Sequence, residues 1–137
     1  MYRNICLKRH LVIITFILIG ITNLKAQTSF SCSYRQYCYW NEVANNYLNC
    51  KGFDENSLFV ISKDEKVLTH TIETMKSTYS IYEKEYDKEN DIWTYHVTSG
   101  EGKKYIYNFD PTNKEIRFIP KKEEKAVMQI FFIKTIY

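Results

Sequence analysis

The sequence predicts an all-β domain, an antiparallel meander of seven to nine strands that closes into a small barrel or curls into a half-barrel. Alternating or wholly apolar segments, rich in aromatic and β-branched residues, recur along the chain, which is typical of strands. Short turns separate these segments, and short turns make neighbouring strands antiparallel. No amphipathic pattern of helical length stands between them. Closure of the sheet would remove the exposed edge strands that otherwise pair with other chains.

The best-defined predicted element is a β-hairpin within Asp91–Phe109. Aromatic and apolar residues occupy alternate positions in both arms, so that they share one face of each arm. A three-residue loop, Gly100–Gly102, brings these two faces together, whereas a shift by one residue would separate them. Gly102 suits the left-handed position that such a loop requires. The expected cross-strand pairs are Trp93 with Phe109, Tyr95 with Tyr107, and Val97 with Tyr105.

Further strands are expected on both sides of this hairpin. They cover residues 34–40, 57–62, 67–72, 77–86, 115–119 and 127–133. The segment 40–48 is compatible with a hairpin or short loop, or with one or two helical turns. Residues 51–56 are expected to form a loop, and the charged residues 121–125 a solvated connector.

Residues 1–26 have the three-part layout of a secretory signal peptide. A basic start is followed by an apolar run of 11 residues, Leu11–Ile21, and the small Ala26 precedes the expected cleavage site. A membrane-spanning helix needs about 20 apolar residues, so this run is too short to cross a bilayer. We therefore expect a single exported β domain, residues 27–137, that is periplasmic or secreted and has no transmembrane span after cleavage.

The balance of charge argues against nucleic acid as a partner. The formal net charge of +3 includes four basic residues that lie in the predicted signal peptide. Residues 27–137 carry 15 basic and 16 acidic residues, which leaves no excess of basic side chains for binding phosphates. The same segment is rich in tyrosine and phenylalanine and poor in glycine and proline, so we expect it to be folded.

Three cysteines, Cys32, Cys38 and Cys50, lie within the expected exported domain. An exported protein meets an oxidising compartment, so one disulfide is expected. We favour Cys38 with Cys50, which would flank a hairpin or a short loop, and Cys32 with Cys50 is the alternative. With the favoured pair, Cys32 would be unpaired, joined to another chain or lipid-modified. Lipid anchoring at Cys32 is disfavoured because the preceding Ser-Phe-Ser lacks the aliphatic residue of a lipoprotein box.

The chain contains no motif for a familiar catalytic or cofactor chemistry. Phosphate-binding, dinucleotide-binding, zinc-protease and serine-hydrolase motifs are all missing from the sequence. His70 and His96 lie in predicted strands, without the cysteine or histidine spacing of a metal site. The acidic residues within 83–91 are expected to form a solvated hairpin tip. The sequence thus predicts a non-enzymatic protein with no cofactor and no metal.

The candidate ligand-binding residues are the aromatic residues of the central hairpin: Trp93, Tyr95, Tyr105 and Tyr107. Their rings would either fill the interior of a small barrel or line a cavity in its mouth. In the second case the protein would bind a small apolar ligand, as lipocalin-like folds do. The alternative is a protein-interaction module, such as an enzyme inhibitor or an envelope component, that acts through its hairpin loops.

Residues 99–105, Ser-Gly-Glu-Gly-Lys-Lys-Tyr, resemble the Ser-x-x-Gly-x-x-Tyr loop of the periplasmic lysozyme inhibitors. That family consists of small disulfide-bearing β-barrels that insert this loop into the cleft of the enzyme. The resemblance covers seven residues and implies that Ser99, Lys104 and Tyr105 form an interaction loop.

Two other stretches resemble small exported Bacteroidota proteins of unknown function. One is the Leu-Lys-Ala-Gln sequence at the expected cleavage site, and the other is the span from Ser57 to Ile119. This resemblance implies export and carries no activity with it.

Overall fold

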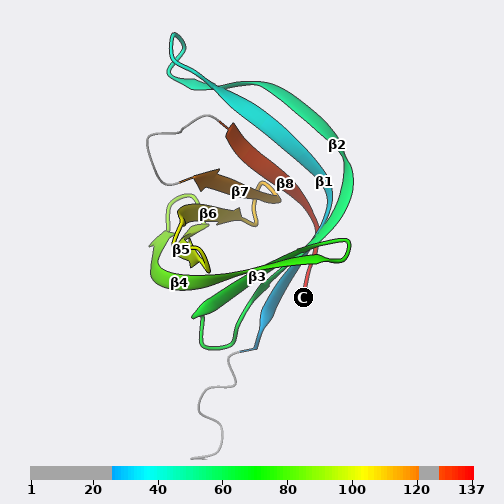
Figure 1. Cartoon of the computed structure of the whole chain (residues 1–137), viewed down its shortest axis with the longest axis vertical. Coiled ribbons are helices and arrows are strands. Elements are labelled where there is room, and N and C mark those ends of the chain that lie inside the picture. Colours follow the sequence, from blue (N-terminus) through cyan, green and yellow to red (C-terminus); the bar gives the residue numbers. More distant parts are fainter. Residues whose placement is uncertain (1–25, 121–126) are drawn as a thin grey trace, which may run out of the picture.

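The computed structural model describes residues 26–120 and 127–137 and contains eight β-strands in this part of the chain (Figure 1). The strands are β1 Thr28–Asn41, β2 Asn46–Ile61, β3 Val67–Ile72, β4 Met75–Asp87, β5 Ile92–Ser99, β6 Lys104–Asp110, β7 Glu115–Pro120 and β8 Val127–Ile136. They form one closed antiparallel barrel in which consecutive strands pair and β1 also pairs with β8. The predicted all-β meander is therefore confirmed, and of the two predicted shapes it is the closed barrel and not the half-barrel. Within the described residues, no helix has the length and apolar character needed to cross a membrane.

The seam between β1 and β8 closes the barrel. β1 pairs with β8 along Phe30–Tyr39 while its other edge pairs with β2. Next to the strand ends, the backbone groups of Ser29 and Tyr137 exchange two hydrogen bonds, with N···O distances of 3.1 and 2.8 Å. Both edges of β1 are thereby occupied, which is how closed barrels avoid pairing with other chains.

The two ends of the barrel differ in shape. β1 begins and β8 ends at one of them, which we call the N-terminal mouth; the C-terminus lies at this end, near the bottom of Figure 1. At the opposite end β1 and β2 project beyond the other strands as a two-stranded arm, seen at the top of Figure 1. We call residues 38–50 the hairpin arm; its turn is formed by residues 42–45.

Aromatic side chains fill the interior of the barrel. Phe59 is completely buried, and its ring centroid lies 4.9 Å from that of Phe131 and 6.0 Å from that of Tyr107. Aliphatic side chains complete the packing between the rings: Leu68, Val97 and Ile116. Each buried ring removes roughly 150–250 Å² from water, so the aromatic residues make a large contribution to the stability of the core.

The central hairpin has the predicted register. β5 and β6 pair Trp93 with Phe109, Tyr95 with Tyr107, and Val97 with Tyr105. In the turn, the Gly102 amide donates to the Ser99 carbonyl at 2.9 Å, and the Ser99 amide donates to the Lys103 carbonyl at 2.9 Å. Gly102 has a φ angle of 79°, as expected for the left-handed position of a three-residue loop.

β2 is longer than predicted and includes an expected loop. Residues 51–56 lie inside β2, so the loop prediction is wrong, and the helical alternative for residues 40–48 is wrong as well. Residues 51–54 of β2 pair with residues 34–37 of β1, and the hydrogen bonds of that ladder outweigh the loop preference of glycine and aspartate. A Cβ atom at Gly52 would lie 2.2 Å from the Tyr34 hydroxyl oxygen, so any other residue there requires the Tyr34 ring to shift.

The other predicted strands are confirmed, and most extend further than the sequence pattern indicates. Residues 67–72 coincide with β3, and the predicted strands at 34–40, 77–86, 115–119 and 127–133 lie within β1, β4, β7 and β8. The connector predicted at 121–125 lies outside the described residues, as does the predicted signal peptide apart from Ala26.

The predicted disulfide between Cys38 and Cys50 is present, and it clamps the base of the hairpin arm. The two Cα atoms are 4.1 Å apart, and Cys38 is almost completely buried. Cys32 is the free cysteine of the described residues and is 1% exposed inside the barrel. Burial raises the pKa of the Cys32 thiol to about 12, against a smaller lowering by the Ser57 side chain. The alternative pairing of Cys32 with Cys50 is therefore wrong.

Loss of the disulfide is expected to destabilise the barrel. The bond joins residues 12 positions apart, and closure of a loop of this length restricts the unfolded chain by about 3 kcal/mol. The double variant C38S/C50S should therefore unfold at a lower urea concentration than the oxidised wild type. Reduced wild type is the matched control and should unfold together with the variant. Equal midpoints for oxidised and reduced wild type would contradict this role of the disulfide.

The Cys32 thiol is expected to be inert in the folded protein. A thiol with a pKa near 12 is almost wholly protonated at pH 8, and its burial also blocks access of reagents. In protein that begins at Gln27, Ellman's reagent should detect no rapid reaction under native conditions and one thiol per chain in urea. The C32S variant should give no signal in either condition. Rapid labelling of the native protein would show that the thiol is exposed.

Candidate functional site

A cavity of about 490 Å³ opens at the N-terminal mouth of the barrel. Its apolar lining comes from β1, β2, β5, β6 and β8: Phe30, Ile61, Trp93, Tyr95, Phe109 and Ile136. These residues come together because each occupies an inward position close to the end of its strand. The size lies within the range of roughly 300–1,000 Å³ that is usual for small-molecule sites.

Tightly packed rings form the floor of the cavity. The centroids of Phe30 and Phe109 are 4.8 Å apart, and the ring of Tyr95 meets Phe109 edge-on at 5.4 Å. Behind them lie Phe59 and Tyr107 of the core, both almost completely buried. The cavity therefore ends at this layer of rings and occupies the mouth of the barrel.

The turn between β2 and β3 supplies a polar rim. Ser62, Lys63 and Glu65 line the cavity there. The Ser62 hydroxyl donates to Asp64 at 2.6 Å and accepts from the Val67 amide at 3.0 Å. The hydrogen bond from Ser62 also lowers the pKa of the Asp64 carboxyl. The rim is thus a hydrogen-bonded turn whose shape is fixed before any ligand arrives.

Charged and aromatic side chains hold Trp93 in place on one wall. Tyr86 stacks on the indole with a centroid distance of 4.4 Å, and the Lys84 ammonium lies 5.5 Å from the centre of the ring. Lys84 also forms an ion pair with Glu65 of the rim. Burial, together with the smaller effect of the charge of Glu65, raises the pKa of Tyr95 to about 12. The Tyr95 phenol therefore stays neutral and serves as a hydroxyl group beside an apolar wall.

The structure divides the four predicted ligand-binding residues into two pairs. Trp93 and Tyr95 line the cavity. Tyr107 belongs to the buried core, and Tyr105 packs against Phe118 with a centroid distance of 4.9 Å. Alternate residues of one strand face the interior at successive depths, so these four rings span the barrel from its mouth inward.

The predicted interaction loop does not form one exposed surface. The Ser99 hydroxyl accepts a hydrogen bond from the Lys103 amide at 3.2 Å, and the Lys104 ammonium lies 5.4 Å from the centre of the Tyr82 ring. The Tyr105 ring is partly buried and packs against the core. Ser99 and Lys104 therefore remain at the surface, while Tyr105 contributes to packing.

A second group of polar side chains lies in the interior towards the hairpin arm. Arg35 forms an ion pair with Glu55 at 2.8 Å, and its guanidinium lies 5.7 Å from the centre of the Phe131 ring. His70 stacks on Phe59 with a centroid distance of 4.0 Å. Burial, together with the charge of Arg35, lowers the pKa of His70 to about 4. His70 is therefore neutral at physiological pH, in agreement with its place among aromatic rings.

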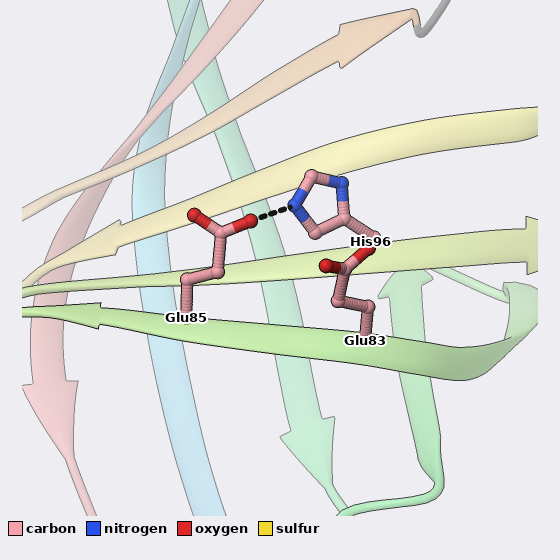
Figure 2. A group of neighbouring side chains, drawn as sticks. All are labelled: Glu83, Glu85 and His96. Carbon is pink, nitrogen blue, oxygen red and sulfur yellow. Dashed lines mark hydrogen bonds and ion pairs between the residues drawn. The ribbon is translucent and has the colours of Figure 1, made fainter.

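The two predicted strand histidines do not converge, but His96 meets two of the acidic residues. Figure 2 shows the carboxylates of Glu83 and Glu85 beside the His96 ring on the outer face of β4 and β5. Glu83 and Glu85 lie within β4, in the strand predicted at 77–86, and both are exposed. His96 is buried although it lies on the outer face of β5.

Comparison of the chain with family models, with curated proteins and with solved structures finds no match. The functional assignment of the barrel therefore depends on its own cavity and side chains.

Acid should weaken the fold through His70. The pKa of this side chain is about 4 in the folded protein and about 6.5 in the unfolded chain, so the unfolded chain takes up the proton first as the pH falls. Protonation of His70 in the unfolded chain therefore does not affect the free energy of unfolding above pH 6.5. As the pH falls from 6.5 towards 4, it lowers this free energy by roughly 3 kcal/mol.

Urea unfolding of wild type and the H70Q variant at several pH values measures this loss. Wild type should lose about 3 kcal/mol more than H70Q between pH 7 and pH 4, with no further difference below pH 4. Comparison with the variant cancels the titration of the carboxylates. Parallel curves for the two proteins would show that His70 titrates normally in the folded state.

Proposed function

We propose that this protein is a non-enzymatic binding protein that holds one small apolar ligand in the N-terminal mouth of its barrel. The observation that carries the proposal is the apolar cavity of about 490 Å³ at the mouth of a barrel whose core is packed mainly with aromatic rings. Small eight-stranded barrels commonly either fill their interior with side chains or hold a single ligand. This barrel combines the two arrangements.

The lining of the cavity favours an apolar ligand with a polar end. Phe30, Trp93 and Phe109 offer ring surfaces, and burial of a ligand against them gains roughly 25 cal/mol for each Å² of apolar surface removed from water. Ser62 and Lys63 lie at the rim, where a hydroxyl or carboxylate group of the ligand would remain near water. Because Trp93 is already held by Tyr86 and Lys84, little ordering of side chains opposes binding.

We further propose that the protein acts after export, in the periplasm or outside the cell. The layout of residues 1–26 supports export. The disulfide between Cys38 and Cys50 is of the kind that persists in oxidising compartments. A soluble carrier or scavenger of an apolar compound suits such a compartment, because apolar molecules cross aqueous spaces poorly without a protein.

The hairpin arm favours a second function, interaction with another protein. Val43 at its turn is 99% exposed, and Tyr39 and Leu48 are also exposed large apolar residues. The arm projects from the barrel (Figure 1), and the disulfide at its base fixes its direction. An arm with exposed apolar side chains offers a contact surface for a protein partner. In this second function the interaction surface is the hairpin arm, residues 38–50, and not the predicted interaction loop at residues 99–105.

Ligand binding is expected to change the fluorescence of Trp93. The chain has two tryptophans, and the W40F variant leaves Trp93 as the only one. Titration of this variant with straight-chain fatty acids of graded length, or with anilinonaphthalene sulfonate, should give a saturable change in emission. The W93F variant, which keeps Trp40 in the distant hairpin arm, is the matched control and should show no change.

A cavity-filling variant separates the mouth from other apolar surfaces. T28F places a ring in the cavity and should weaken binding about tenfold or more, whereas T98F, a matched change in β5 outside the cavity lining, should leave it unchanged. Equal affinity of wild type and T28F would exclude the mouth as the site. A bare monomer in native mass spectrometry, combined with no saturable titration, would favour the protein-interaction function instead.

A further inference from the structure

We propose that Glu83, Glu85 and His96 form a binding site for a divalent transition-metal ion on the outer face of β4 and β5. The site is independent of the cavity, which faces the interior of the barrel. Its donors are one imidazole nitrogen and two carboxylate oxygens, and all three lie within 4.8 Å of one another. Figure 2 shows both carboxylates turned towards the ring.

The distances require only a small adjustment for a metal ion to bind. His96 Nε2 lies 2.9 Å from a carboxylate oxygen of Glu85. Zinc binds nitrogen and oxygen donors at about 2.0–2.2 Å in a tetrahedral arrangement, so two donors on one ion lie roughly 3.3–3.6 Å apart. Small rotations of the two glutamate side chains are therefore enough to bring their oxygens to these distances.

The burial of the three side chains suits this adjustment. The side chain of His96 is 10% exposed, so its ring is fixed by the surrounding protein, whereas the side chain of Glu85 is 63% exposed. Tyr82 lies next to the histidine, with ring centroids 6.1 Å apart. A fixed imidazole and two mobile carboxylates form a set that can close on an ion while the sheet stays in place.

A β-bulge in β4 creates this cluster. Tyr79 and Ile81 face the core, and strict alternation would point Glu83 and Glu85 into the core as well. The register between β4 and β5 shifts between Ile81 and Glu83, which turns both glutamates to the outer face. Glu83 then stands directly opposite His96.

A histidine–glutamate contact alone explains only part of the arrangement. It accounts for Glu85, but Glu83 adds a second negative charge beside the first. Two carboxylates brought together on one face of a sheet repel each other, and a cation between them would remove that repulsion. The metal site therefore explains the position of all three side chains.

The donor set favours a transition metal over calcium or magnesium. Imidazole nitrogen is a good ligand for zinc, copper and nickel, whereas calcium takes six to eight oxygen ligands. Three protein donors at the surface leave at least one coordination position for water or for a group from another molecule. Zn²⁺ is the natural probe, because it has no redox chemistry and tolerates this geometry.

Calorimetric titration of untagged protein with zinc chloride tests the proposal. One Zn²⁺ should bind per chain, and E83Q should weaken the affinity about tenfold or more, because it removes one ligand. Glu83 is exposed, so E83Q should keep the fold and the melting temperature of the metal-free protein. E89Q, an exposed acid in the turn after β4, is the matched control and should bind like wild type.

Two further measurements make the result specific. H96Q should lose saturable binding, and the imidazole nitrogen resonances of His96 in wild type should shift on addition of Zn²⁺ while those of His70 stay in place. Absence of saturable Zn²⁺ binding by wild type, or binding that E83Q and H96Q leave unchanged, overturns the proposal. Calcium binding as tight as zinc binding overturns the assignment to a transition metal.

Discussion

The hydrogen-bonded seam between β1 and β8 is the constraint on which the rest of the structure depends. Eight strands joined into a ring fix the circumference, and the circumference fixes how much side-chain volume the interior can hold. Phe59, Tyr107 and Phe131 use that volume in the middle of the barrel. The cavity lies where strands end, between the start of β1 and the end of β8. The candidate binding site is thus a consequence of closure together with an aromatic core.

Some parts of the fold follow from local sequence and others do not. The register of β5 and β6 could be predicted because alternation and a single left-handed glycine, Gly102, both determine it within 19 residues. Residues 51–56 could not be predicted as a strand, because their own composition favours a loop and only pairing with β1 makes them extended. Likewise, Tyr95 and Tyr107 have the same pattern in the sequence. Both are buried and they pair across the hairpin, yet only Tyr95 lines the cavity, because the lining also depends on neighbours from β1, β2 and β8.

The positions of Glu83 and Glu85 depend on a β-bulge that simple alternation of strand residues does not predict. Glu83 and Glu85 continue the alternation that Tyr79 and Ile81 begin, and a strict strand would bury two carboxylates without partners. Burial of that kind is so costly that a bulge before Glu83 could have been inferred from the sequence. The partner residue was harder to find, because His96 comes from the other strand of the hairpin and its position depends on the size of the register shift. The interior pair of Arg35 and Glu55 is similar, since it too forms across a bulged part of a ladder.

The closing seam also determines the order in which the chain can fold. Every other strand pairing joins neighbours in sequence, whereas β1 must wait for β8, the last strand to be made. Until then both strands present unpaired edges, and contacts between such distant segments form slowly. During this interval β8 of one molecule can complete the barrel of another, because the two edges are complementary whichever chain supplies them. A swapped dimer that exchanges β8 is therefore the misfolded product this architecture most readily allows, especially at high concentration.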